Sequence, residues 1–230
     1  VNGVPYVYND VFKDIDKKTG RLTYDLSKRP GMGKAVKFCP SLWGGKDWPP
    51  EAWNPKTKLF YIPANNHLCS ELPKADEITY KKGDLYIGYP IDGVLGSLRY
   101  ENGKPSTIGE LQAWDLNTGK MAWVHKFDRA IWAPLLTTGG NLLFTGGTND
   151  RIFRAFDAST GKVLWQRDYE SKPHHLHARS SYASCTPTVD ADRVFVAWSD
   201  PDHTWLKAFD HAGKELWSAD FGPWVSQHGF

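Results

Sequence analysis

The sequence has no long apolar run, because its longest apolar stretches are only the length of a β-strand. A helix that spans a bilayer needs about 20 apolar residues, so we expect no transmembrane segment. Residues 1–8 also lack the charged start and apolar stretch of a signal peptide. Because the chain does not begin with Met, we expect it to be the interior of a longer gene product or a processed chain.

Net charge is also small, with 28 basic against 26 acidic residues and a formal charge of +2 at pH 7. A nucleic-acid-binding surface needs clustered positive charge, so we expect no nucleic-acid partner. The motifs H-E-x-x-H, G-x-S-x-G, G-x-x-x-x-G-K-[ST] and C-x-x-C-H do not occur. Their absence removes the usual sequence signatures of zinc proteases, serine hydrolases, P-loop NTPases and covalently attached haem.

Aromatic residues and turn formers are abundant by contrast. The chain has 11 Trp, 10 Tyr and 11 Phe, together with 21 Gly and 15 Pro. Aromatic residues favour β-strands, and frequent Gly and Pro leave little room for long helices. A chain of 230 residues can bury one substantial core. The composition therefore predicts one all-β domain.

A short segment recurs along the chain. Residues 111–123 read LQAWDLNTGKMAW, residues 153–165 read FRAFDASTGKVLW, and residues 206–217 read LKAFDHAGKELW. A weaker copy, DIDKKTGRLTY, covers residues 14–24. Each copy predicts a hairpin in which one strand ends at Asp, a Gly supplies the positive φ of the turn, and the second strand carries the aromatic residue.

The spacing of the repeat indicates a propeller of four-stranded blades. The closing residues Trp123, Trp165 and Trp217 stand about 40 to 50 residues apart, as in blade repeats. One blade is predicted with strands at 133–138, 141–146, 151–157 and 162–168, and another over 184–221 with its clearest strand at 193–199. The alternative is a β-sandwich whose hairpins are similar by accident, which three copies of the motif disfavour.

The repeated A-x-D-x-x-T-G-K-x-x-W pattern resembles the tryptophan-docking motif of the methanol and ethanol dehydrogenases that depend on pyrroloquinoline quinone (PQQ). In that family the motif joins neighbouring blades of an eight-bladed propeller. Residues 38–69 resemble the family more specifically: a Cys-Pro opens a loop, a Gly-Gly-Lys-Asp-Trp turn corresponds to the turn that faces the quinone, and a strand follows. The resemblance continues through residues 108–147 and covers residues 1–166.

The pattern changes from Arg167 onward. The sequences SSYASCTPTVD at 180–190 and VSQHG at 225–229 resemble PQQ-like repeat propellers related to an outer-membrane assembly lipoprotein, which generally bind no quinone. The chain is then either a divergent family member or a join of two related genes. We expect residues 1–230 to form a partial propeller of about four to five blades, dehydrogenase-like over 1–166 and repeat-like over 167–230.

The resemblance assigns four residues to the quinone site. Asp47 takes the place of an Asn or Asp beside the quinone, and Trp48 follows where a backbone group approaches it. Lys46 or a metal would have to offset the repulsion between an ionised Asp47 and the carboxylates of PQQ. Trp132 matches a tryptophan that stacks on PQQ as the floor of its site. The alternatives are a solvated turn for Lys46 and Asp47, and a core position for Trp132.

Cys39 and Cys69 match the positions of a family disulfide that closes the loop between them. Such a bond reduces the entropy of the unfolded chain and implies an oxidising compartment, so we expect a periplasmic protein. The alternative is two separate buried thiols. Cys185 has no partner in this scheme, and we expect it to be a small buried residue.

The chain offers no convincing metal ligands. His174, His175 and His177 lie in a loop without the spacing of a metal site, so we expect a solvated connector. The family's catalytic Asp, its Glu and Asn metal ligands and its adjacent Cys pair have no match here, and we expect them upstream of Val1. This chain therefore contributes no catalytic residue and no ligand to the metal.

The resemblance implies a fragment of a periplasmic enzyme that oxidises an alcohol. Its cofactors would be PQQ and Ca²⁺ or a lanthanide, and its electron acceptor a cytochrome. We expect the fragment alone to be inactive. The alternative is a non-catalytic propeller that acts as a protein-interaction scaffold, which the tail favours and residues 38–69 oppose.

Overall fold

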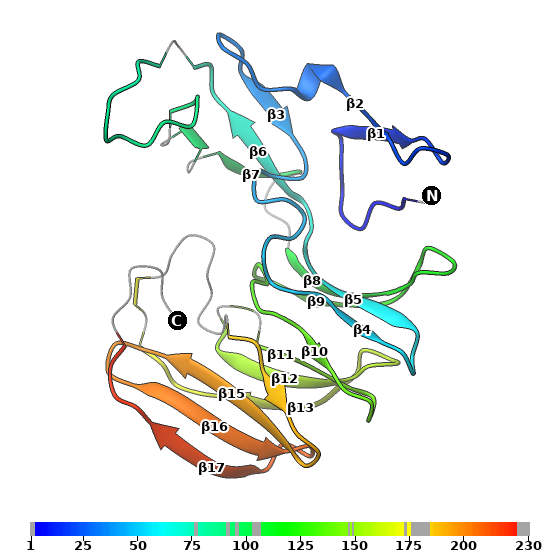
Figure 1. Cartoon of the computed structure of the whole chain (residues 1–230), viewed down its shortest axis with the longest axis vertical. Helices are drawn as coiled ribbons and strands as arrows, with labels where there is room; N and C mark the ends of the chain where they lie inside the picture. Colours follow the sequence, from blue (N-terminus) through cyan, green and yellow to red (C-terminus); the bar gives the residue numbers. More distant parts are fainter. Residues whose placement is uncertain are drawn as a thin grey trace. The chain divides into compact units, whose positions relative to one another are not determined.

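The computed structural model describes residues 3–75, 78–90, 93–94, 97–102, 107–146, 148, 150–172, 174–175 and 185–224. Seventeen strands and one short 3-10 helix, η1 (Leu26–Lys28), are described. They belong to two compact units: Val1–Gly45 with Asn65–Ser106, and Lys46–Ala64 with Thr107–Phe230 (Figure 1). The all-β architecture predicted from the repeat is confirmed.

The first unit contains a hairpin and a three-stranded sheet. The hairpin pairs β1 (Phe12–Ile15) with β2 (Leu22–Tyr24), and the sheet has the order β3 (Val36–Phe38), β6 (Leu68–Leu72), β7 (Leu98–Tyr100). Val36, Phe38 and Leu72 form a small buried cluster. The weak repeat copy at residues 14–24 is thus a hairpin, and its Gly20 has φ +74° in the turn.

The second unit contains three antiparallel four-stranded sheets, which we call blades 1, 2 and 3. Blade 1 is β4 (Ala52–Asn54), β5 (Leu59–Asn65), β8 (Gly109–Asp115) and β9 (Lys120–Phe127). Blade 2 is β10 (Leu136–Thr137), β11 (Leu142–Thr145), β12 (Ile152–Asp157) and β13 (Val163–Asp168). Blade 3 is β14 (Thr188–Val189), β15 (Arg193–Ser199), β16 (Thr204–Asp210) and β17 (Glu215–Asp220). Blades 2 and 3 confirm the two predicted blades.

Apolar side chains fill the space between successive blades. Tyr61 and Leu111 of blade 1 pack with Leu143 and Phe156 of blade 2. A second cluster joins blades 2 and 3 and consists of Phe144, Phe153, Ala155, Val194, Val196, Trp198 and Phe209. Burial of each such large side chain contributes about 1.5–3 kcal/mol, so these clusters hold neighbouring blades together.

Trp123 on β9 illustrates how the repeat joins blades. Its indole Nε1 donates a hydrogen bond to the carbonyl oxygen of Ala158 in blade 2, at 3.1 Å. The ring also lies over Gly161, where an added Cβ would be 2.5 Å from Cε3 of Trp123. The glycine is therefore required both by its φ of +73° and by the ring above it.

Trp165 on β13 repeats this arrangement against blade 3. Its Nε1 donates to the carbonyl oxygen of His211 at 2.9 Å, and a Cβ on Gly213 would lie 2.5 Å from Cδ2 of the ring. Trp217 on β17 is at the edge of blade 3 and is 40% exposed. Two of the three motif tryptophans thus lie on a turn of the next blade, and the third is open to solvent.

One strand differs from its predicted extent. Residues 133–138 were expected as the innermost strand of blade 2, but only Leu136–Thr137 pair as β10. The N–H of Leu135 instead donates to the carbonyl oxygen of Pro50 at 3.1 Å. Because this N–H is committed to a neighbouring loop, the ladder of blade 2 does not begin until Leu136.

Candidate functional site

The loop that carries Lys46, Asp47 and Trp48 enters blade 1 at β4. The ammonium group of Lys46 is 3.0 Å from Oε1 of Glu51 and donates to the carbonyl oxygen of Asp47 at 2.8 Å. Oδ2 of Asp47 is shielded from solvent. Trp48 is 83% exposed, so its indole offers nearly its whole surface to a neighbouring molecule.

These contacts bear on the expected role of Lys46. Its positive charge already faces the carboxylate of Glu51, and its contact with Asp47 is to the backbone carbonyl. Glu51 therefore offsets part of the positive charge of Lys46, which was expected to balance the negative charge of Asp47. Sequence reasoning did not single out Glu51, which lies directly before β4 and three residues before the Asn-Pro dipeptide at 54–55.

Trp132 lies between β9 and β10 and is 7% exposed. Its segment runs beside the loop that carries Trp48, because the N–H of Leu135 donates to the carbonyl oxygen of Pro50 at 3.1 Å. The structure therefore brings together the two segments to which the resemblance assigned the quinone site. Trp132 is buried, so it supports this region from within and presents little free surface.

The side chain of Asn54 joins these two segments by hydrogen bonds. Its Nδ2 donates to Oγ1 of Thr137 and to the carbonyl oxygen of Thr138, both at 2.9 Å, and the side chain is fully buried. Its Oδ1 accepts the backbone N–H of Lys56 at 2.9 Å, which closes a tight turn. Sequence reasoning missed this residue. The Asn-Pro dipeptide at 54–55 marks the turn, but no local signal indicates the contacts with residues 137 and 138.

The loop of residues 46–51 combines an exposed aromatic side chain with polar ones. Trp48 is exposed, and Lys46 and Glu51 of the same loop form an ion pair. Such a mixture of aromatic surface and few polar groups is typical of cofactor sites.

Metal ligands are absent from the part of the chain that the structure describes, where no group of three or more His, Cys, Asp or Glu side chains could hold an ion. His174 and His175 are described, and Nδ1 of His174 lies 3.1 Å from the carbonyl oxygen of Lys172. His177 lies outside the described residues.

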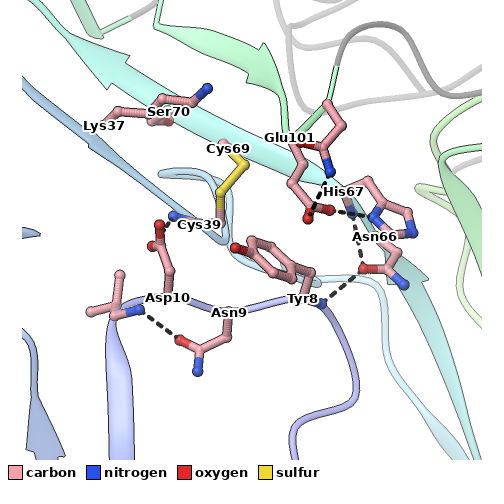
Figure 2. The surroundings of a disulfide bond; sticks show 12 residues. Tyr8, Asn9, Asp10, Lys37, Cys39, Asn66, His67, Cys69, Ser70 and Glu101 are labelled. Carbon is pink, nitrogen blue, oxygen red and sulfur yellow. Dashed lines mark hydrogen bonds and ion pairs between the residues drawn. A yellow bond between two sulfur atoms is a disulfide. The ribbon is translucent and has the colours of Figure 1, made fainter.

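A disulfide joins Cys39 and Cys69 in the first unit, with Cα atoms 4.3 Å apart and a sequence separation of 30 residues (Figure 2). Both cysteines are buried. The backbone N–H of Cys39 donates to Oδ1 of Asp10 at 2.7 Å, and Oδ2 of Asp10 is 2.5 Å from the ammonium group of Lys28. The bond therefore lies in a polar network that ties the segment at Asp10 to the loop.

A contact between a histidine and a glutamate lies beside the disulfide. Nδ1 of His67 is 2.6 Å from Oε2 of Glu101, and the N–H of Glu101 donates to the carbonyl oxygen of His67 at 3.0 Å (Figure 2). Asn66 accepts the N–H of Tyr8 on its Oδ1 at 2.8 Å. The loop that the disulfide closes is thus anchored by residues distant in sequence, which no local pattern could reveal.

The prediction that Cys185 is buried is wrong. Its side chain is exposed and forms no disulfide, its Sγ lies 3.9 Å from the carbonyl oxygen of Thr186, and partial burial still raises the pKa of its thiol. It lies before β14 and lines a pocket together with Tyr169, Ser171 and Trp198.

The family of the chain follows from a comparison with known proteins. The family model described as "Glucose/ethanol/alcohol dehydrogenase, beta-propeller domain", with the short name PQQ, matches residues 12–184. The chain belongs to this quinoprotein propeller family. The match passes Arg167, where the sequence predicted a change to a repeat-like tail, and that division stays a prediction.

Curated relatives are quinoproteins of the same family. The chain is 40% identical over 173 residues to the quinoprotein alcohol dehydrogenase PedE of Pseudomonas putida, covering 72% of this chain and 26% of that protein. It is 36% identical over 168 residues to a lanthanide-dependent methanol dehydrogenase of Methylacidiphilum fumariolicum, covering 73% of this chain and 26% of that protein. The chain thus spans about a quarter of the length of these relatives.

The fold comparison agrees with the sequence comparison. A solved structure described as a europium-containing methanol dehydrogenase matches 91% of this chain and 32% of its own, with a TM-score of 0.65 and 29% identity. This match extends the structural likeness over nearly all of the chain. It supports the prediction of a partial propeller, because the matched protein is about three times longer than the matched part.

Proposed function

We propose that this chain is part of a periplasmic, PQQ-dependent alcohol dehydrogenase and forms one wall of its quinone pocket. The observation that carries the proposal is the family match over residues 12–184, which includes both segments held together by the bond between Leu135 and Pro50. The names of the relatives support alcohols as the substrate class. The match across residues 38–69 favours this function over a non-catalytic scaffold.

In the proposed enzyme, PQQ would supply the two-electron oxidation of the alcohol when it is bound. The residues of this chain hold and orient the cofactor. Trp48 provides an aromatic surface against it, and buried Trp132 supports the wall from within. The amide of Asn54 and the N–H of Leu135 keep the two segments in register, so the wall is rigid before the cofactor arrives.

The metal would be Ca²⁺ or a lanthanide, as the name of the lanthanide-dependent relative indicates. The resemblance places its ligands in another part of the protein. Asp47 carries a negative charge near the proposed cofactor carboxylates, and such a charge is tolerable beside a multivalent cation.

The electron acceptor is proposed to be a cytochrome, as in a relative named methanol dehydrogenase [cytochrome c] subunit 1, to which the chain is 31% identical over 162 residues. The disulfide between Cys39 and Cys69 suits an oxidising compartment, which supports the periplasm. In the described residues no helix has the length and apolar character needed to cross a membrane.

The test uses the full-length gene product, reconstituted with PQQ and either Ca²⁺ or La³⁺. Dye reduction that depends on added alcohol is the expected result. Absence of turnover from a folded, PQQ-loaded protein would overturn the proposal. Trp48→Ala should weaken PQQ binding by up to about tenfold, the value of one aromatic contact. Trp53→Ala is the matched control, because Trp53 is an exposed tryptophan of the same unit.

A further inference from the structure

Gly109 is the first residue of β8, and it is buried where the chain leaves β9. Its partner on β9 is Phe127, the last residue of that strand. The N–H of Ile108 donates to the carbonyl oxygen of Phe127, and the N–H of Gly109 donates to that of Arg129, both at 3.0 Å. Two backbone hydrogen bonds therefore hold the chain that leads from β9 toward Trp132 against the start of β8.

The approach of this chain leaves no space for a side chain at Gly109. An added Cβ would lie 2.3 Å from the carbonyl oxygen of Arg129 and 3.1 Å from the backbone N of Ile131. Both are backbone atoms, so no rotation of a side chain could relieve the contact. Because non-bonded heavy atoms prefer separations of about 3.5 Å or more, even alanine would displace residues 129–131 by about 1 Å.

The segment that would be displaced is closely packed. Ile131 and Leu135 are buried and belong to the apolar cluster between blades 1 and 2, and Trp132 lies between them in sequence. The N–H of Leu135 donates to the carbonyl oxygen of Pro50, which joins this segment to the loop of residues 46–51. Because the core confines the segment, a shift at residues 129–131 would move Trp132 and alter the bond to Pro50.

We propose that Gly109 is a positioning residue for the quinone site. The absence of a side chain lets the backbone of residues 129–131 lie on β8, and this contact fixes where Trp132 stands beside the loop of residues 46–51. The inference rests on the proposed function, in which Trp132 supports the wall of the pocket. A preformed site tolerates displacements of about 0.5 Å, so a shift of about 1 Å in its support is enough to weaken cofactor binding.

Three alanine variants of the full-length gene product test this role. Gly109→Ala should raise the dissociation constant of PQQ by about tenfold, the value of one aromatic contact. Turnover with an alcohol should fall by up to about 100-fold, as for a displacement of 1 Å. Gly139→Ala, in the turn after β10, is the control that should change neither value, because nothing lies within 4 Å of an added Cβ there.

Gly213→Ala is the control for a general loss of stability. An added Cβ at Gly213 would lie 2.5 Å from the ring of Trp165, between blades 2 and 3. This variant should lower the melting temperature and leave PQQ binding unchanged. Unchanged PQQ affinity in Gly109→Ala, or an equal loss of affinity in Gly109→Ala and Gly213→Ala, would overturn the inference. Failure of the proposed function shows differently, because the unaltered protein would then bind no PQQ, and that result would overturn both.

Hydrogen exchange of the full-length protein without PQQ tests the same contact directly. In the unaltered protein, peptides that contain Gly109 and residues 129–135 should exchange as slowly as the interior of β8. Gly109→Ala should speed exchange across residues 129–135, and Gly139→Ala should not. Fast exchange at Gly109 in the unaltered protein would overturn the inference, even if Gly109→Ala does not fold.

Discussion

The glycine beneath each docking tryptophan allows a direct test of blade packing. A methyl group at Gly161 would lie 2.5 Å from Cε3 of Trp123, and the new alanine would have to keep φ at +73°. The left-handed conformation costs about 1–2 kcal/mol, and an extra methyl in a packed interface costs about 1–3 kcal/mol. We therefore expect Gly161→Ala to lower the free energy of unfolding by about 2–5 kcal/mol.

Gly222→Ala separates these two costs. Gly222 has φ +78°, but no atom lies within 4 Å of an added Cβ, so only the conformational cost of about 1–2 kcal/mol applies. Urea unfolding of the oxidised chain, followed by far-ultraviolet circular dichroism at one protein concentration, gives both values. Equal losses at the two positions would refute the claim that Trp123 closes the space above Gly161.

A double-mutant cycle provides a second check on the same contact. Trp123→Ala removes the ring that the methyl group at position 161 would strike. The loss of unfolding free energy in the double variant should then be smaller than the sum of the losses in the two single variants, by about 0.5–3 kcal/mol. Additive losses would show that the two residues do not touch in solution.

Three further predictions concern the disulfide, an ion pair and a docking bond. Replacing Cys39 and Cys69 by Ser should lower the free energy of unfolding in urea by about 3–4 kcal/mol, because the bond closes a loop across a separation of 30 residues. An unchanged urea midpoint would contradict the bond. The Asp220 carboxylate, 2.7 Å away, raises the pKa of His203 by hydrogen bonding. Protonated His203 therefore stabilises the folded chain fully below about pH 6.5, and this stabilisation is lost as the pH rises. His203→Gln should then lower the free energy of unfolding more near pH 5.5 than near pH 9. Equal losses at the two pH values would refute the pair. Trp165→Phe removes an N–H donor and part of a ring. Thermal melting should show that the free energy of unfolding falls by about 1–3 kcal/mol.

Local pattern predicted several strands of blades 2 and 3. Residues 151–157 and 162–168 were predicted as strands and are observed as β12 and β13, and residues 193–199 match β15. An Asp, a short turn and a positive-φ Gly define where each hairpin reverses, and alternating side chains define its faces. These signals are local, so the sequence pattern was enough to locate them.

The candidate site could be predicted only in part. Residues 38–69 and Trp132 identified the two segments of the wall by resemblance, and the structure places those segments side by side through Leu135 and Pro50. The exposure of Trp48 and the burial of Trp132 could not be read from either motif. Whether a tryptophan in a loop is covered depends on which other segments pack over it, and those segments are distant in sequence.

The sequence by itself predicted the hairpins and the repeat of blades, because each depends on a contiguous motif. Its resemblance to a known family also implied the pairing of Cys39 with Cys69. Only the tertiary structure decided that Asn54 bonds residues 137 and 138, that Glu51 faces Lys46 and that Cys185 is exposed. It also decided which docking tryptophan lies open. The reason is physical: each of these outcomes depends on groups brought together by chain topology, which short-range patterns of side chains do not record.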